Sequence, residues 1–110
     1  MKPFRTANSY AADLQQAYDY FKQGGHPAGD RFLERHDEVQ RTLVEHPFIC
    51  RLRPSGWRQL AIPRSTYAIF YREAAVFWFL GGVLSTVQDP DLLQARLLIL
   101  EVRETDEQAE

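Results

Sequence analysis

The chain has very little cysteine and no recognisable export signal. Cys50 is the one cysteine in 110 residues, which excludes an internal disulfide framework and is typical of a reducing cytoplasm. Its apolar neighbours Phe48, Ile49 and Leu52 predict that the thiol is buried. No basic segment followed by an apolar run opens the sequence, so we expect no secretory signal and a cytoplasmic protein.

Long apolar runs and clustered metal ligands are also missing. The longest apolar stretch, residues 74–83, is about half of the ~20 residues needed to span a bilayer, so we expect no membrane segment. His26, His36 and His46 are too widely spaced in the sequence to predict a metal site. No phosphate-binding glycine motif occurs, and Cys50 with His46 lacks a third orienting group. We therefore expect no metal, no cofactor and no catalytic nucleophile.

Neither sign of charge dominates, which bears on the partners. Thirteen Lys and Arg residues against fifteen Asp and Glu residues give a net charge of −2. Proteins that grip nucleic-acid phosphates are usually strongly basic, so we expect no direct sequence-specific binding of nucleic acid. The basic residues are nevertheless concentrated in one region of the second half, at Arg51, Arg53, Arg58, Arg64 and Arg72.

Composition suits one domain with one core, since 45% of the residues are apolar and 13% are aromatic. The last residues are mostly acidic and carry almost nothing to bury. We therefore assign residues 1–104 to a single domain and residues 105–110 to a disordered acidic tail.

The first half has helical periodicity. Residues 2–7 could form a short extended segment, and Pro3 would restrict it to the edge of a sheet. Apolar residues then recur every three or four positions from residue 10 to residue 21, and again from residue 28 to residue 43. A Gly-Gly-His-Pro turn at residues 24–27 separates the two segments. This pattern predicts a helical hairpin with its apolar side turned to a sheet.

The second half alternates with the period of a strand. Residues 57–62, 66–72 and 76–84 predict three consecutive antiparallel strands, with a bend or bulge at Gly81 and Gly82. The fold class is therefore α+β, with an N-terminal helical hairpin packed on a three- to four-stranded antiparallel sheet. Beyond Pro90 the chain could form a strand, but we favour a helix that frays after Arg103.

Six fragments between residues 4 and 90 are loose individually but specific in their order and spacing. They are Asp13-Leu14-x-x-Ala17-x-x-Tyr20, Ala28 with Phe32-Leu33, Leu43-x-x-x-Pro47, Arg58-x-Leu60, Tyr67-x-Ile69-Phe70-Tyr71-Arg72, and Val83-Leu84-x-x-x-x-Asp89-Pro90. Together they resemble the ParE/RelE superfamily of toxins from type II toxin-antitoxin systems. The resemblance implies the fold inferred above and a cognate antitoxin as partner.

The departures from the family pattern distinguish its branches. The ribosome-dependent ribonucleases of the family carry an arginine where this chain has Ala68, a basic residue or histidine after the last strand, and a tyrosine beyond it. This chain has no basic residue at 85–88 and no tyrosine after Tyr71. It therefore resembles the ParE branch more closely, which implies plasmid stabilisation, inhibition of DNA gyrase by binding rather than catalysis, and neutralisation by a ParD-type antitoxin.

Two other functions stay open from the sequence. One is a RelE-like ribosome-dependent mRNA endonuclease, and the other is a non-toxic binding module derived from this fold. The resemblance implies that the toxin has an apolar groove edged by arginines where the antitoxin binds, and that a few residues contact the target or the antitoxin. The candidate residues are Arg58, Arg64, Tyr67, Tyr71 and Arg72.

Each candidate also has an ordinary structural interpretation. Arg58 is equally well an exposed ion-pair partner on a strand. Tyr67 and Tyr71 on one face of a strand are most simply half-buried aromatics with hydroxyls at the rim of the sheet. Arg64 in a turn is usually solvated.

Overall fold

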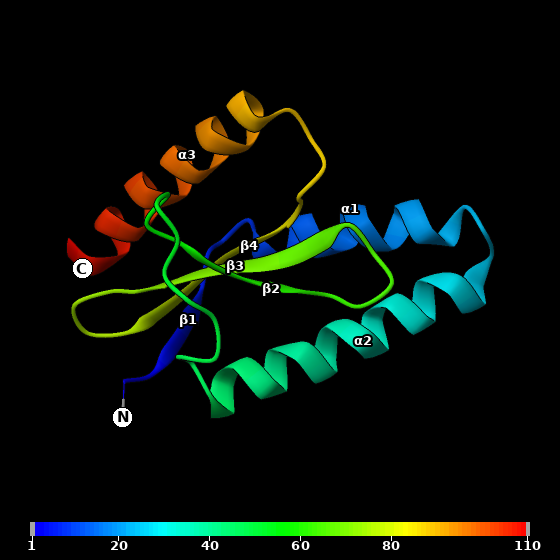
Figure 1. Ribbon diagram of the computed structural model, residues 1–110, viewed down its shortest axis with the longest axis horizontal. Coiled ribbons are helices and arrows are strands. Elements are labelled where there is room, and N and C mark those ends of the chain that lie inside the picture. The colour runs from blue at the N-terminus through cyan, green and yellow to red at the C-terminus, as the bar shows by residue number, and fades with distance from the viewer. Residues whose placement is uncertain (1, 110) are drawn as a thin grey trace.

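A four-stranded sheet separates a helical hairpin from a third helix in the computed structural model (Figure 1). The structure describes residues 2–109, with side chains for residues 2–100. None of the helices over this range is both long and apolar enough to cross a membrane. The elements, in chain order, are β1 (Phe4–Thr6), α1 (Tyr10–Lys22), α2 (His26–Glu45), β2 (Arg58–Ala61), β3 (Tyr67–Glu73), β4 (Trp78–Ser85) and α3 (Pro90–Ala109).

The helical hairpin predicted from the sequence is confirmed. Gly25 precedes α2 with a φ of 112°, a conformation that residues with a side chain rarely adopt, and Pro27 occupies the first turn. The two helices approach closely at Gly29, where a Cβ atom would lie 2.6 Å from the ring of Tyr18. Glycine at this position therefore allows α2 to pack against α1, a requirement that periodicity alone does not reveal.

The sheet has the strand order β1-β4-β3-β2. β2 pairs antiparallel with β3, and β3 with β4, as predicted for consecutive strands joined by short turns. β1 instead pairs parallel with β4, so the sheet is mixed and not wholly antiparallel. The two helices and two strands between β1 and β4 return the chain in the same direction, which a short turn cannot do.

The double glycine in β4 lies at an irregularity in pairing, as expected. Phe70 pairs with Gly82, but the next residue of β3, Tyr71, pairs with Leu80. Gly81 is therefore the extra residue of a bulge. A Cβ atom on Gly81 would lie 2.7 Å from Cζ3 of Trp57, so the indole ring occupies the space that a side chain would need.

The two faces of the sheet carry separate cores. The alternation predicted along β3 determines which of its residues belong to each core. Ile69 and Tyr71 lie against the hairpin, while Ala68 and Phe70 lie on the α3 side. The hairpin-side core contains Tyr10, Ala17, Phe32, Leu43, Ile62, Ile69, Tyr71, Trp78, Leu80 and Val83. The α3-side core contains Ala7, Trp57, Ala68, Phe70, Ala74, Phe77, Phe79, Leu84, Leu97 and Leu100.

The C-terminal segment is a helix, as favoured from the sequence. The carboxylate of Asp89 accepts a hydrogen bond of 2.7 Å from the backbone N–H of Asp91, which satisfies one free donor of the first turn. The helix continues past Arg103 to Ala109, so the expectation that it frays after Arg103 is wrong. The helical pattern of hydrogen bonds extends further than the apolar residues that suggested it. The division into a domain at 1–104 and a tail at 105–110 stays a prediction.

Candidate functional site

The segment between α2 and β2, residues 46–57, presents apolar side chains to solvent, and we call it the arginine loop because it also carries Arg51 and Arg53. Phe48 is 65% exposed, Ile49 53% and Leu52 59%. Cys50 is half-buried, so the expectation that its thiol is buried is wrong. The side chains point outward because the sheet holds the loop by its backbone.

Two of the predicted site residues make that attachment. Arg58 on β2 and Tyr71 on β3 lie directly opposite each other across the two strands. The hydroxyl of Tyr71 donates to the carbonyl oxygen of Pro47 at 3.0 Å. Arg58 donates from Nη1 to the carbonyl oxygen of Cys50 at 2.5 Å, and its guanidinium lies 5.2 Å from the centre of the Phe48 ring. Arg58 and Tyr71 therefore position the arginine loop.

Tyr71 lies deeper than the sequence suggested. Its side chain is fully buried and not half-buried, because the arginine loop covers it. The pKa of the Tyr71 phenol is raised to about 12, mainly by burial and also by the nearby Cys50 thiol, while the Arg58 guanidinium acts in the opposite direction. The phenol therefore remains a neutral hydrogen-bond donor to Pro47 over the physiological pH range.

A groove lies beside the arginine loop, between β2 and α3. It has a volume of about 290 Å³, with Phe70, Leu93 and Leu97 among its lining residues and Arg53 and Gln59 also bordering it. β2 is the last strand of the sheet over the described residues, so its outer backbone groups face this side without a partner strand. The arrangement is an apolar groove bordered by an arginine, which we call the β2–α3 groove.

Arg72 lies on the α3 side of the sheet, apart from Arg58 and Tyr71. Its side chain is half-buried, and its guanidinium lies 5.4 Å from the ring of Trp57. The Arg72 guanidinium therefore packs over the indole ring of Trp57, at the end of the arginine loop. Direct binding by Arg72 stays a prediction.

The charge of this region is of one sign. No Asp or Glu occurs between His46 and Arg72, so the arginine loop, β2 and nearly all of β3 add only positive charge. The chain as a whole has a net charge of −2, and its acidic residues therefore lie elsewhere. An acidic and partly apolar ligand is the chemical complement of such a surface.

The remaining candidates, Arg64 and Tyr67, lie at the other end of the sheet. Arg64 is exposed in the turn between β2 and β3, and Tyr67 is half-buried where β3 begins, as the ordinary interpretation of each predicted. The five candidates thus divide among three places and do not converge on one. Sequence reasoning also missed Tyr20, which is 60% exposed beside Arg64 and Tyr67.

The position that distinguishes the ribonuclease branch is enclosed. Ala68 is buried in the α3-side core, where α3 contributes Leu97 and Leu100 to the same cluster. At the end of β4, the hydroxyl of Ser85 lies 3.1 Å from the hydroxyl of Thr66, and the side chain of Gln88 donates to the Ser85 carbonyl. The described geometry at these positions therefore links turns to one another and presents no cation.

Known proteins resemble this chain in both sequence and structure. The sequence model described as "ParE toxin of type II toxin-antitoxin system, parDE" matches residues 4–107. A solved structure titled "Chromosomal ParDE TA system from P. aeruginosa" aligns with a TM-score of 0.66 at 20% sequence identity, covering 77% of this chain and 96% of that chain. This structural similarity shows the fold. A search of curated protein sequences gave no match.

Proposed function

The chain belongs to the ParE toxin family of type II toxin-antitoxin systems, and from this premise we propose that it inhibits DNA gyrase and is neutralised by a ParD-type antitoxin. The antitoxin binds the arginine loop and the adjoining β2–α3 groove. The toxin acts through binding, without a cofactor, in the cytoplasm. The similarity to a solved chromosomal ParDE system supports the pairing with a ParD-type partner.

The observation that carries the antitoxin site is the outward-facing apolar side chains of a loop without acidic residues. Three exposed side chains, Phe48, Ile49 and Leu52, lie within a few residues of Arg51 and Arg53. Exposed apolar groups of this size mark an interaction surface when they are contiguous and rimmed by polar residues. An antitoxin segment with alternating apolar and acidic side chains would bury the former and pair the latter with arginines.

The open edge of β2 supports the same location. An extended antitoxin segment could add a strand beside β2, or an amphipathic helix could lie in the β2–α3 groove over Leu93 and Leu97. Both modes place the partner against Arg53 and Gln59, which border the groove. The arginine loop and the groove therefore form one continuous candidate interface.

Binding can be tested by co-expression with the adjacent open reading frame and titration of the purified partners. We expect a stable complex that is weakened by the double variant Arg51→Glu, Arg53→Glu. The matched control is Arg31→Glu, which changes an exposed arginine on α2 away from the loop. Equal loss of affinity in the control, or no effect of the loop variant, would place the antitoxin elsewhere.

The target requires a separate assay. Purified toxin should inhibit supercoiling by gyrase or cause cleaved DNA to accumulate, and should leave ribosome-bound mRNA intact. Codon-specific cleavage of mRNA at sub-stoichiometric toxin would instead identify a ribosome-dependent endonuclease. Binding of the antitoxin without effect in either assay would indicate a non-toxic binding module.

A further inference from the structure

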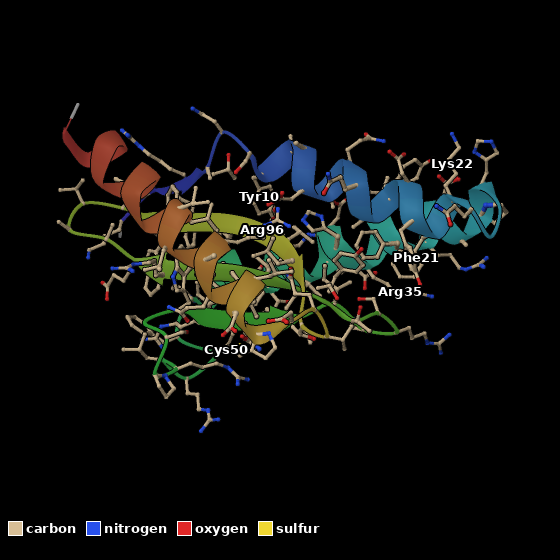
Figure 2. All side chains as sticks on the ribbon, turned by 90° about the horizontal axis from the view of Figure 1, so that it is seen from above. Tyr10, Phe21, Lys22, Arg35, Cys50 and Arg96 are labelled. Atoms are coloured by element: carbon tan, nitrogen blue, oxygen red, sulfur yellow. The ribbon has the colours of Figure 1, made fainter. Side chains whose placement is uncertain are left out.

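A second hollow lies at the opposite end of the sheet from the arginine loop. It has a volume of about 350 Å³ and is lined by Tyr20, Phe21, Arg64, Ser65 and Thr66, and we call it the Arg64 pocket. Figure 2 shows Phe21 and Cys50 well separated along the length of the molecule. A ligand in the Arg64 pocket would therefore leave the arginine loop open.

A group of aromatic rings packed against one another lies at the base of the pocket. Phe21 stacks on Phe32 with ring centres 4.7 Å apart, and Phe32 meets Tyr67 edge-on at 5.8 Å. Tyr20 rests against this group, 6.4 Å from Tyr67 and 5.3 Å from Phe21, yet it is 60% exposed. The Tyr20 ring is thus held from beneath while much of its surface remains available for packing.

Arg64, which lines the same pocket, has an unfavourable backbone conformation. Its φ is 61°, in the left-handed region that few residues other than glycine, asparagine and aspartate adopt. The turn is held in place because Ser65 Oγ donates to the Ile62 carbonyl at 2.7 Å and accepts from the Tyr67 N–H at 3.1 Å. Strain of this kind persists where the surrounding structure imposes it and is concentrated at functional sites.

The Arg64 guanidinium is available to bind an anionic ligand. Among residues 2–100 it makes no hydrogen bond or ion pair with another side chain or with the backbone. The residues that line the pocket include no acid, while Ser65 and Thr66 add hydroxyl groups. An unpaired cation and an exposed aromatic ring in the same pocket are complementary to a carboxylate beside a flat apolar group.

We propose that the Arg64 pocket binds a short acidic segment of a protein partner, with an aromatic or aliphatic side chain on Tyr20 and the adjacent carboxylate on Arg64. A nucleic acid fits less well, since its phosphates require several cations and this pocket has one in a chain with a net charge of −2. The site is distinct from the antitoxin surface proposed above and does not depend on it.

Amide chemical-shift NMR on the full chain tests this assignment. The probe is an acetylated and amidated peptide containing Trp-Asp-Glu, compared with the same peptide carrying Trp-Asn-Gln. We expect the Trp-Asp-Glu peptide to shift the resonances of Tyr20, Phe21 and residues 64–66. The Trp-Asn-Gln peptide should bind at least about tenfold more weakly.

Arg64→Asn is the decisive variant because asparagine tolerates the left-handed conformation, so the turn should keep its shape. It should weaken binding of the acidic peptide about tenfold, whereas Arg51→Asn in the arginine loop should leave binding unchanged. The proposal is overturned if the peptide shifts residues 48–58 instead, if it binds nowhere, or if adenosine monophosphate produces the same shifts more strongly than the peptide.

Discussion

At the scale of single residues, Arg58 and Tyr71 show that a side chain can serve a binding surface without lying on it. Both use strand positions to hold backbone carbonyls of the arginine loop, at Cys50 and Pro47. Phe48, which follows Pro47, is exposed as a result. Its ring also contacts the edge of Trp78, with ring centres 5.0 Å apart. Loss of either anchor should therefore affect stability and partner binding together.

Arg58→Ala should lower the free energy of unfolding by about 1–2 kcal/mol, because it removes a charge-assisted hydrogen bond and a cation–π contact. Thermal and denaturant melts measure this directly. Arg51→Ala, at an exposed position of the same loop, is the control and should change stability by less than about 0.5 kcal/mol. An unchanged melt for Arg58→Ala combined with lost toxicity would show that Arg58 contacts the target directly.

Tyr71 predicts a loss of stability at high pH. Its folded-state pKa is about 12, raised from 10.0 mainly by burial, so the unfolded chain loses the phenolic proton first. The stability that the neutral phenol contributes is complete below pH 10 and is lost as the pH rises towards 12. Burial also raises the pKa of Tyr10, which acts in the same direction.

Urea unfolding of the wild type and of Tyr71→Phe at about pH 8 and about pH 11 should separate these contributions. The variant should be less stable by about 1 kcal/mol at the lower pH, because its ring no longer donates to Pro47. Its further loss of stability at the higher pH should be smaller than that of the wild type. Parallel losses in the two proteins would show that Tyr71 ionises as easily in the folded state as in the unfolded chain.

At the scale of elements, the described part of α3 contacts the rest of the molecule through buried leucines and through an ion pair made by Arg96. Leu97 and Leu100 are buried against the sheet. Nη2 of Arg96 lies 3.2 Å from Oδ1 of Asp13, a buried residue in the first turn of α1. In Figure 2 the labelled Arg96 lies near the beginning of α1. A Cβ atom on Gly82 would lie 2.6 Å from the Asp13 carboxylate, so glycine there makes room for this connection.

Two truncations test what each part of α3 contributes. Deletion of residues 105–110 should change stability little, since this stretch has no apolar residue except Ala109. Deletion from Leu92 onward removes Leu97 and Leu100, and burial of each leucine is worth roughly 1.5–3 kcal/mol against a typical total of ~5–15 kcal/mol. We expect a severe loss of folded protein. Equal melting temperatures for the two truncations would assign the leucines to a partner interface.

At the scale of the whole molecule, charge is distributed so that a chain with a slight excess of acid still presents a basic surface. The segment from His46 to Arg72 has no acidic residue, and the sheet brings much of it to one end of the molecule. The turn between β2 and β3, which carries the Arg64 pocket, lies at the opposite end of these strands (Figure 1). Two partners could therefore bind the chain at the same time.

The proposed antitoxin complex should depend on ionic strength. Raising the salt concentration from about 0.05 M to about 0.5 M screens the rim charges, so the association rate should fall while apolar contacts of Phe48 and Leu52 maintain the complex. Association and dissociation rates at several salt concentrations provide the measurement. In the Arg51→Glu, Arg53→Glu variant the salt dependence should diminish, and an association rate insensitive to salt in the wild type would argue against the charged rim.

The local pattern of apolar and polar residues in the sequence determined most of the helices and strands of this protein. Spacing of apolar residues in steps of three and four predicted the hairpin, alternation predicted β2 to β4, and the faces of β3 followed from the period of a strand. These features depend on neighbours within a few residues. The order of the fragments also sufficed to identify the family, which the comparison confirmed.

Only the tertiary structure decided how distant segments meet. The parallel pairing of β1 with β4, the outward orientation of Phe48 and the exposure of Tyr20 each depend on contacts with elements far along the chain. An apolar run next to arginines has the same pattern whether it is buried or exposed. What turned this one outward was the attachment of its backbone to Arg58 and Tyr71, and no local periodicity encodes that attachment.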